Sequence, residues 1–522
     1  MTTLREAVQL EGFWLCAIVA AWLAWACIRR VRRCAWKCLW ILLAASAVLV
    51  ATESVRIKLD GDDVVIARTA RSFAQAGLRQ STGVWNGILV LDKRPPMAAF
   101  LGSWVCRLGG LPLPSCVAIA NAFLVGPLFL GGLYWLLLRT GSRRTAALAL
   151  LAAAALPLAG YVFTGGGLEP AYLLGLVLAA GFIMDGDENG ALAAGAWTAL
   201  SRYEGVLAAA VIVALVLARR WRMGAGEPRF HLLRGARALG AGLLLALASS
   251  HTLATVVLGG QDYAARYGKA QTGAGASMDM LRPSHAGFNL LHQAQFLFEP
   301  TRGLPNAPLL ALAGAGALAL LTFRRRVWPA VFLAPFLVTS LCLLASYWGD
   351  ATDAVIWRLM LPLLVALLVL VVHALQVLHR PVLTGFVLGS VLLWALAEKW
   401  DKPYLRDTRQ FNNVTALAQT DWTGRQYDLL KAYSQGGGGE APRPVVLVTT
   451  AADWPDVCGL AVLSPEDIPG QRLLLRKRQR EGVRYFAVVV YWKKPPPPGA
   501  EVLDSKSFAD GTTFRLVAMR FD

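Results

Sequence analysis

The chain has 522 residues, of which 56% are hydrophobic and only 16% are charged, and its formal net charge is +18. Its mean hydropathy is +0.49. Apolar runs such as "LPLLVALLVLVVHALQVL" lack the helical or strand alternation that half-exposed elements of a large soluble core require, so that class is excluded.

Apolar runs that reach or approach the ~20 residues needed to cross ~30 Å of hydrocarbon recur along the chain. They predict a polytopic α-helical membrane protein with about twelve transmembrane helices. The predicted spans lie near residues 12–28, 37–53, 114–138, 145–162, 168–184, 190–202, 204–218, 237–257, 306–322, 328–346, 356–378 and 382–398.

Basic loops fall at alternate ends of successive spans, as one consistent topology demands. Short loops rich in Lys and Arg resist translocation, so these loops are predicted to be cytoplasmic. Their basic residues equal the net charge of +18 in number, so the charge indicates orientation and contact with anionic lipid headgroups, and no nucleic-acid partner. One loop on this side, "DGDENG" at 185–190, is acidic and departs from the trend. The basic loops lie at 29–37, 139–144, 218–237, 323–326 and 379–381.

This topology predicts two domains, with both termini on the outer side. Residues 1–398 form the transmembrane domain, whose large outer loops are 54–113 and 258–305. Residues 399–522 are predicted to form a small α/β domain on the outer face, because "PVVLVTT" and "RYFAVVVYW" are typical of buried strands. The eight cysteines include no C-x-x-C pair, and they are interpreted as small apolar packing residues.

Three carboxylates, Asp60, Asp62 and Asp63, follow one of the most apolar segments of the chain. The next residues predict a short amphipathic helix on the membrane surface that stops at Gly77, so that Asp62 or Asp63 lies at its N-terminus. Capping alone needs only one carboxylate, and three within four residues indicate a further role. The helix is predicted to bury Val65, Ile66, Ala70, Phe73 and Ala74 and to present Arg68 and Arg71 at headgroup depth.

Two further polar features interrupt apolar segments. Glu169 follows three glycines in "FTGGGLEP", at the outer entrance of a span, where glycines permit close approach of a ligand. An interfacial Glu that caps the span before Pro170 is the alternative. Arg202 and Glu204 in "LSRYEG" separate two half-length spans, a pattern typical of a site that lines a membrane cavity.

Three other cations are predicted on the same outer side. Lys93 and Arg94 precede a Pro-Pro turn in "LDKRPPMAAF", and Arg358 begins a late span in "WRLMLP". For each cation alone, a side chain that reaches toward the lipid headgroups is the alternative interpretation. The prediction of a site depends on their convergence on one face.

Together these motifs resemble the GT-C superfamily of membrane glycosyltransferases, which includes protein O-mannosyltransferases and the lipid A aminoarabinose transferase. Family motifs of the form D-E-x-x-Y-A-x-x-A-R and K-P-P-L-x-x-W are similar to "DDVVIARTAR" and "KRPPMAAF" in the first outer loop. Ile66 replaces the aromatic of the first motif, and Arg94 is inserted before the prolines of the second. "SRYEG", "GLEP" and "WRLMLP" resemble later elements in the same order, over roughly residues 55–380.

The resemblance implies transfer of a sugar from a polyprenyl-phosphate donor, with inversion, to a lipid, glycan or protein acceptor at the outer leaflet of a bacterial inner membrane. Asp62 would be the general base, beside Asp63, and Glu169 would position the sugar or share that role. Arg202, Arg358, Lys93 and Arg94 would bind the donor phosphate.

No cofactor is required by the sequence. A divalent metal held by Asp62, Asp63 and Glu169 is left open, with His285 and His292 as further ligands or as ordinary loop histidines. A transporter or flippase of a lipid-linked sugar is the rival function, although no internal repeat supports it. A membrane scaffold with an outer binding module would leave Asp62, Glu169 and Arg202 unexplained.

Overall fold

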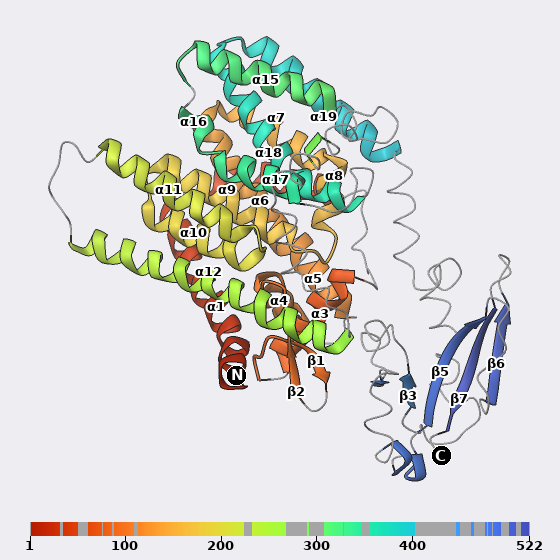
Figure 1. Ribbon diagram of the computed structural model, residues 1–522. Coiled ribbons are helices and arrows are strands. Elements are labelled where there is room, and N and C mark those ends of the chain that lie inside the picture. Colours follow the sequence, from red (N-terminus) through yellow and green to blue (C-terminus); the bar gives the residue numbers. More distant parts are fainter. Residues whose placement is uncertain are drawn as a thin grey trace.

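The computed structural model shows a mainly helical body and a separate group of strands near the C-terminus (Figure 1). The structure describes residues 2–31, 35–50, 61–75, 77–85, 88–108, 113–223, 232–267, 290–291, 307–326, 328–346, 354–401, 445–448, 461–463, 475–477, 479–482, 484–491, 501–507 and 513–520.

Each predicted span coincides with one helix or with two or three consecutive helical elements. The predicted span 145–162 is divided at Leu156, because Pro157 starts a new helix. The number of membrane crossings remains a prediction. The helices of the first half are α1 (Thr2–Val31), α2 (Ala35–Val50), α3 (Gly61–Gln75), α4 (Met97–Cys106), α5 (Leu113–Ala120), the π-helix η1 (Asn121–Val125), α6 (Gly126–Thr140), α7 (Arg143–Ala155), α8 (Pro157–Phe163), α9 (Glu169–Asp185), α10 (Glu188–Ser201), α11 (Gly205–Met223) and α12 (Leu232–Tyr267).

An antiparallel pair, α9 and α10, lies at the centre of this body. Every residue from Glu169 to Ile183 and from Asn189 to Ser201 is buried, as expected for helices that are apolar on all faces. Gly186 ends α9 in the left-handed region at φ +73°, and the side chain of Asp187 caps α10. Because this connection is short, the start of α9 and the end of α10 meet at the opposite end of the pair.

The turn between α9 and α10 gathers the basic ends of other helices. Asp185 accepts a hydrogen bond from Arg139 at 2.8 Å, and Asp187 accepts one from Arg30 at 3.3 Å. Arg219 donates to the carbonyl oxygen of Ile183. Three of the predicted cytoplasmic loops and the acidic loop therefore lie on one side of the protein, as the alternation of charge predicted. The acidic loop departs from the charge trend because it neutralises its basic neighbours.

The first outer loop forms a layer at the other side. It contains α3, a hairpin of β1 (Ser81–Trp85) and β2 (Ile88–Leu91), and α4, and α3 packs against β1, α4 and α5. In Figure 1, α3, α5 and α8 lie to the right of the helical body, whereas the adjoining ends of α11 and α12 lie to the left.

The structure confirms the helix α3 but not its predicted open polar face, because all residues from Ile66 to Ala70 are buried. Ile66, Ala70 and Phe73 are buried and Gly77 adopts φ +65°, as predicted. Arg68, predicted on the polar face, is only 8% exposed. The sequence prediction treated α3 as open on one whole face, whereas β1, α4 and α5 cover more than one side of it.

The surface of the helical body carries many large apolar side chains. On α12, Leu239, Leu243 and Leu247 are exposed at four-residue spacing, which places them on one helical face. Within the described chain, helical segments long and apolar enough to cross a bilayer are Leu4–Arg30, Cys116–Thr140, Arg237–Gln261 and Met360–Val377. Exposure of an apolar stripe is unfavourable in water but not in lipid. These helices and their exposed apolar side chains indicate that the chain is a multi-pass membrane protein.

The later elements extend the body and add one sheet. The strands form a five-stranded sheet in the order β4-β3-β5-β7-β6. The neighbours β4, β3 and β5 run parallel, and β7 runs antiparallel to both of its neighbours, β5 and β6. This agrees with the predicted strands, and an independent outer α/β domain remains a prediction. The elements are α15 (Ala307–Phe323), α16 (Trp328–Val331), α17 (Ala334–Ser346), α18 (Ala354–Val377), α19 (Pro381–Asp401), β3 (Val445–Val448), β4 (Ala461–Leu463), β5 (Arg484–Tyr491), β6 (Glu501–Ser507) and β7 (Thr513–Met519).

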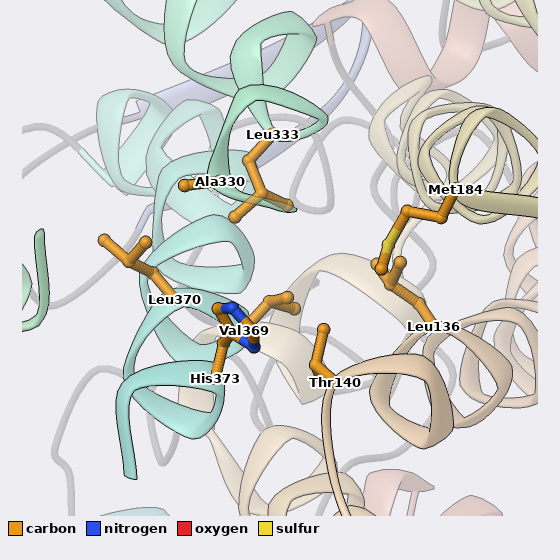
Figure 2. Close-up of a pocket in the computed structure, with 8 residues that line it drawn as sticks. All are labelled: Leu136, Thr140, Met184, Ala330, Leu333, Val369, Leu370 and His373. Atoms are coloured by element: carbon orange, nitrogen blue, oxygen red, sulfur yellow. The ribbon is translucent and has the colours of Figure 1, made fainter. Parts of the chain in front are cut away.

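A small, partly open void lies between α6, α9, α16 and α18, with room for about one water molecule. Figure 2 shows His373 and Val369 of α18 facing Thr140 and Leu136 of α6 across it. Thr140 ends α6 and Met184 lies near the end of α9, so the void lies toward the side of Asp185. It is too small and too far toward that side to serve the predicted outer site.

We expect Asp185→Asn to lower the free energy of unfolding by about 1 kcal/mol, because Asp185 is largely buried while its arginine partners remain partly exposed. Thermal unfolding in detergent measures the change. The matched control is Glu188→Gln in the same turn. An equal loss in both variants would contradict the importance of the ion pairs.

Candidate functional site

The site is built on a buried ion pair at the end of the central helix pair. Glu169 begins α9 and Arg202 follows the last residue of α10, and Arg202 Nη1 lies 2.5 Å from Glu169 Oε1. The side chain of Glu169 is 5% exposed and that of Arg202 is 12% exposed. Such a pair offsets the cost of removing both charges from water only when the two groups are in contact. The predicted convergence of these two residues is therefore present.

Arg202 is held between two carboxylates. Its Nε also donates to Glu204 Oε2 at 3.0 Å, across the turn that separates α10 from α11. The backbone of Arg202 is extended, and the helix restarts at Gly205, whose N–H donates to the Arg202 carbonyl at 3.0 Å. The predicted break at Arg202 is confirmed, but only α10 is short: α11 (Gly205–Met223) has 19 residues, so it is not the half-length helix that was predicted. Most guanidinium donors of Arg202 already bind carboxylates, which leaves few donors for a phosphate.

A buried asparagine fixes the glycine turn in front of Glu169. Asn121 Nδ2 donates to the carbonyl oxygens of Gly165 and Gly167 at 2.8 and 3.0 Å. Asn121 is fully buried, and it begins the π-helix η1 between α5 and α6. Single π turns inside longer helices are frequent at functional sites. Sequence reasoning missed Asn121, although one amide within an apolar run was a usable signal.

The predicted cations Lys93 and Arg94 lie at the end of β2, beside a buried carboxylate that was not predicted. Asp92 Oδ1 accepts from the Arg94 N–H at 3.0 Å, and Asp92 Oδ2 accepts from the Thr69 hydroxyl at 2.6 Å. Burial raises the pKa of the Asp92 carboxyl above its usual range, while Arg94 and Thr69 act in the opposite direction. Asp92 therefore joins the Lys93–Arg94 segment to α3.

A second polar contact joins this segment to α12 and α1. Gln80 Nε2 donates to the carbonyl oxygen of Arg94 at 3.0 Å, and its Oε1 lies 3.0 Å from His251 Nε2. The Gln80 N–H donates to the carbonyl oxygen of Gln9 at 2.8 Å. The loop that carries the cations is thus fixed by residues far away in sequence, and nothing local predicted Gln80 or His251.

The remaining predicted residues lie only partly within the described structure. Asp62 and Asp63 occupy the first turn of α3, and Arg358 occupies the early part of α18, but their side chains are outside the described residues. His285 and His292 are outside them altogether. Within the described part of the chain, no group of three or more His, Cys, Asp or Glu side chains could hold a metal.

Comparison with solved structures identifies the architecture. The chain is similar to ArnT from Cupriavidus metallidurans bound to undecaprenyl phosphate, with a TM-score of 0.53, 16% identity, and coverage of 92% of this chain and 97% of ArnT. The chain has the GT-C fold. The same ArnT in the apo state gives a TM-score of 0.51 at 16% identity and the same coverage.

No protein-family model and no curated protein matches the chain. The archaeal oligosaccharyltransferase AglB from Archaeoglobus fulgidus, in complex with an inhibitory peptide and a dolichol-phosphate, gives a TM-score of 0.44 at 14% identity, and the match covers 87% of this chain and 69% of AglB.

We expect Gly205→Ala to lower the free energy of unfolding by about 1–3 kcal/mol, because a Cβ there would collide with the carbonyl oxygen of Thr198 and lie 3.0 Å from Ala199 Cα. Backbone atoms cannot move away as a flexible side chain would. The control is Gly242→Ala in α12, where an added Cβ meets nothing within 4 Å. Similar thermal unfolding of both variants would contradict the tight turn.

Proposed function

We propose that this protein is a glycosyltransferase that moves a sugar, with inversion, from a polyprenyl-phosphate donor to an acceptor hydroxyl at the outer leaflet of a bacterial inner membrane. The observation that carries this proposal is the buried Glu169–Arg202 pair at the break between α10 and α11, within a GT-C fold. The acceptor is a lipid, a glycan or a protein, and the site and the C-terminal sheet face the periplasm.

The depth of the ion pair suits a lipid-linked donor. A helix of 14 residues such as α10 is about 21 Å long, which is less than the ~30 Å of the hydrocarbon layer. If the Asp185 turn lies at one interface, Arg202 is recessed below the other one. A polyprenyl phosphate keeps its charge at the headgroups, next to this recess, and ArnT has been crystallised with undecaprenyl phosphate. Charged groups at such depth are usually kept for function.

Asp62 is assigned as the general base, with Asp63 beside it as a second carboxylate. An acceptor hydroxyl is a poor nucleophile until a carboxylate removes its proton in the transition state. Asp62 lies in the first turn of α3, on the outer layer that packs against α5. The new bond joins the acceptor oxygen to the anomeric carbon as the bond from that carbon to the phosphate oxygen breaks.

The cations divide into two groups in this proposal. Lys93, Arg94 and Arg358 stabilise the charge that develops on the departing phosphate, and the Asp92 contacts hold Arg94 in position. Arg202 was predicted to bind phosphate as well, but its contacts with Glu169 and Glu204 favour a different role. It holds Glu169 in position, so that this carboxylate can accept hydrogen bonds from sugar hydroxyls.

Asp62, Asp63 and Glu169 are also suitable oxygen ligands for a divalent cation, which would neutralise the donor phosphate when bound. The transporter alternative gains no support from the described contacts.

The decisive test of the proposal is transfer activity in membranes that contain polyprenyl-phosphate-linked sugars. We expect Asp62→Asn to reduce turnover by about 10²–10⁴-fold, because the amide keeps the shape but cannot accept the proton. Glu188→Gln, on the other side of the protein, is the control and should retain activity. Unchanged turnover of Asp62→Asn at equal expression would reject the assigned base, and a loss confined to Asp63→Asn would move the role to that residue.

A double-mutant test separates the structural and functional roles of the ion pair. We expect Arg202→Gln to lower the free energy of unfolding by about 3–5 kcal/mol, since Glu169 would remain buried without its partner. Adding Glu169→Gln removes the orphaned charge and should recover much of that stability. Transfer should remain lost in the double variant, and recovery of both stability and transfer would show that the pair is only structural.

A further inference from the structure

Two cysteines of the outer layer lie next to each other. Cys106 is the last residue of α4, Cys116 lies in α5, and both are free cysteines whose side chains interact. Cys116 is 1% exposed, whereas Cys106 is partly exposed. The sequence analysis treated both residues as apolar packing groups, because a spacing of ten residues matches no redox or zinc motif.

The backbones of α4 and α5 also approach closely at this point. A Cβ added at Gly102 would lie 2.7 Å from Val117 Cγ2 and 3.2 Å from Val117 Cα. Cys106 lies four residues after Gly102 and so shares its helical face, and Cys116 adjoins Val117. A disulfide requires Cα atoms about 4.4–6.8 Å apart. The close approach of α4 and α5 one turn away from the thiols favours such a separation.

The pair lies on the side of the protein that the proposed function assigns to the cell exterior. α4 and α5 pack against α3, and the chain continues from α5 into η1, where Asn121 holds the glycine turn before Glu169. The ion pairs of Asp185 and Asp187 mark the opposite side. Disulfides form and persist in oxidising exterior compartments and are rare in the cytosol.

We propose that Cys106 and Cys116 form a disulfide bond in the mature protein, with an exterior thiol–disulfide oxidoreductase as the oxidant. The thiolate of Cys106, the more accessible residue, attacks the oxidant disulfide, and one oxidant thiolate leaves. The thiolate of Cys116 then attacks Cys106 Sγ and releases the second oxidant thiolate. The protein loses two protons and two electrons, and the oxidant gains them as a dithiol.

This bond would brace the helix that carries the assigned base. Arg107, next to Cys106, donates to the carbonyl oxygen of Phe73 at 3.4 Å, and an added Cβ at Gly102 would lie 3.4 Å from Ala70 Cβ. Both contacts connect α4 to α3. A covalent link from α4 to α5 therefore restrains two of the surfaces against which α3 packs. The inference rests on the sidedness given by the proposed function, but not on the reaction itself.

The test is maleimide labelling and peptide mapping of full-length protein extracted without reductant and denatured. We expect Cys106 and Cys116 to resist labelling until reductant is added and to appear as one linked peptide pair. Cys106→Ser should expose Cys116 to labelling, and Cys116→Ser should expose Cys106. Cys27, near the opposite side on α1, is the internal control and should be labelled in both conditions.

A second measurement shows whether the bond acts on the fold. Reductant should lower the thermal midpoint of the wild type, and Cys106→Ser and Cys116→Ser should be insensitive to it. Full labelling of both thiols in protein extracted without reductant would overturn the proposal. So would a result in which prior treatment with a thiol oxidant does not lower the labelling of Cys106 and Cys116. If both thiols are labelled and the protein has transferase activity, only the disulfide proposal is rejected. If Cys106 and Cys116 are linked and the protein has no transferase activity, only the transferase assignment is rejected.

Discussion

The buried pair of Glu169 and Arg202 depends on one constraint, which is that α9 and α10 run antiparallel through the centre of the protein. A tight turn at Gly186 joins them on one side, so the two charged residues meet on the other. Neither charge is tolerable alone at this depth, and together they form a fixed polar point in an apolar body. The contacts around this pair fix its surroundings. Asn121 holds the glycine turn before Glu169, and Glu204 and the Gly205 N–H both bind Arg202.

A second polar layer is fixed around this point from a different part of the chain. The hairpin of β1 and β2 carries Lys93 and Arg94, and buried contacts attach it to α3 through Asp92 and to α12 through Gln80 and His251. Polar groups buried in this way are stable only when they are paired, so the network specifies one arrangement of the loop. In the proposed function, a rigid loop would present its cations to the donor phosphate with little loss of entropy on binding.

Sequence reasoning succeeded where the signal was local. Apolar runs gave the helices, the glycine at position 77 gave the end of α3, and the polar interruption at Arg202 gave the break between α10 and α11. It failed at Arg68, which is buried because three elements cover α3. It also missed Asn121 and Asp92, since the sequence around a polar residue does not identify the distant residue that it contacts.

Hydrophobic periodicity and the alternation of basic loops by themselves determined that this chain is a helical membrane protein and which helix ends share a side. These properties depend on neighbours within one or two turns, so they can be read along the chain. Only the tertiary structure decided which polar groups meet, because the contacts of Glu169 with Arg202, of Asn121 with Gly165 and of Gln80 with His251 join residues 33, 44 and 171 positions apart. Such pairs form because helix packing brings them together in a medium where an unpaired polar group is costly.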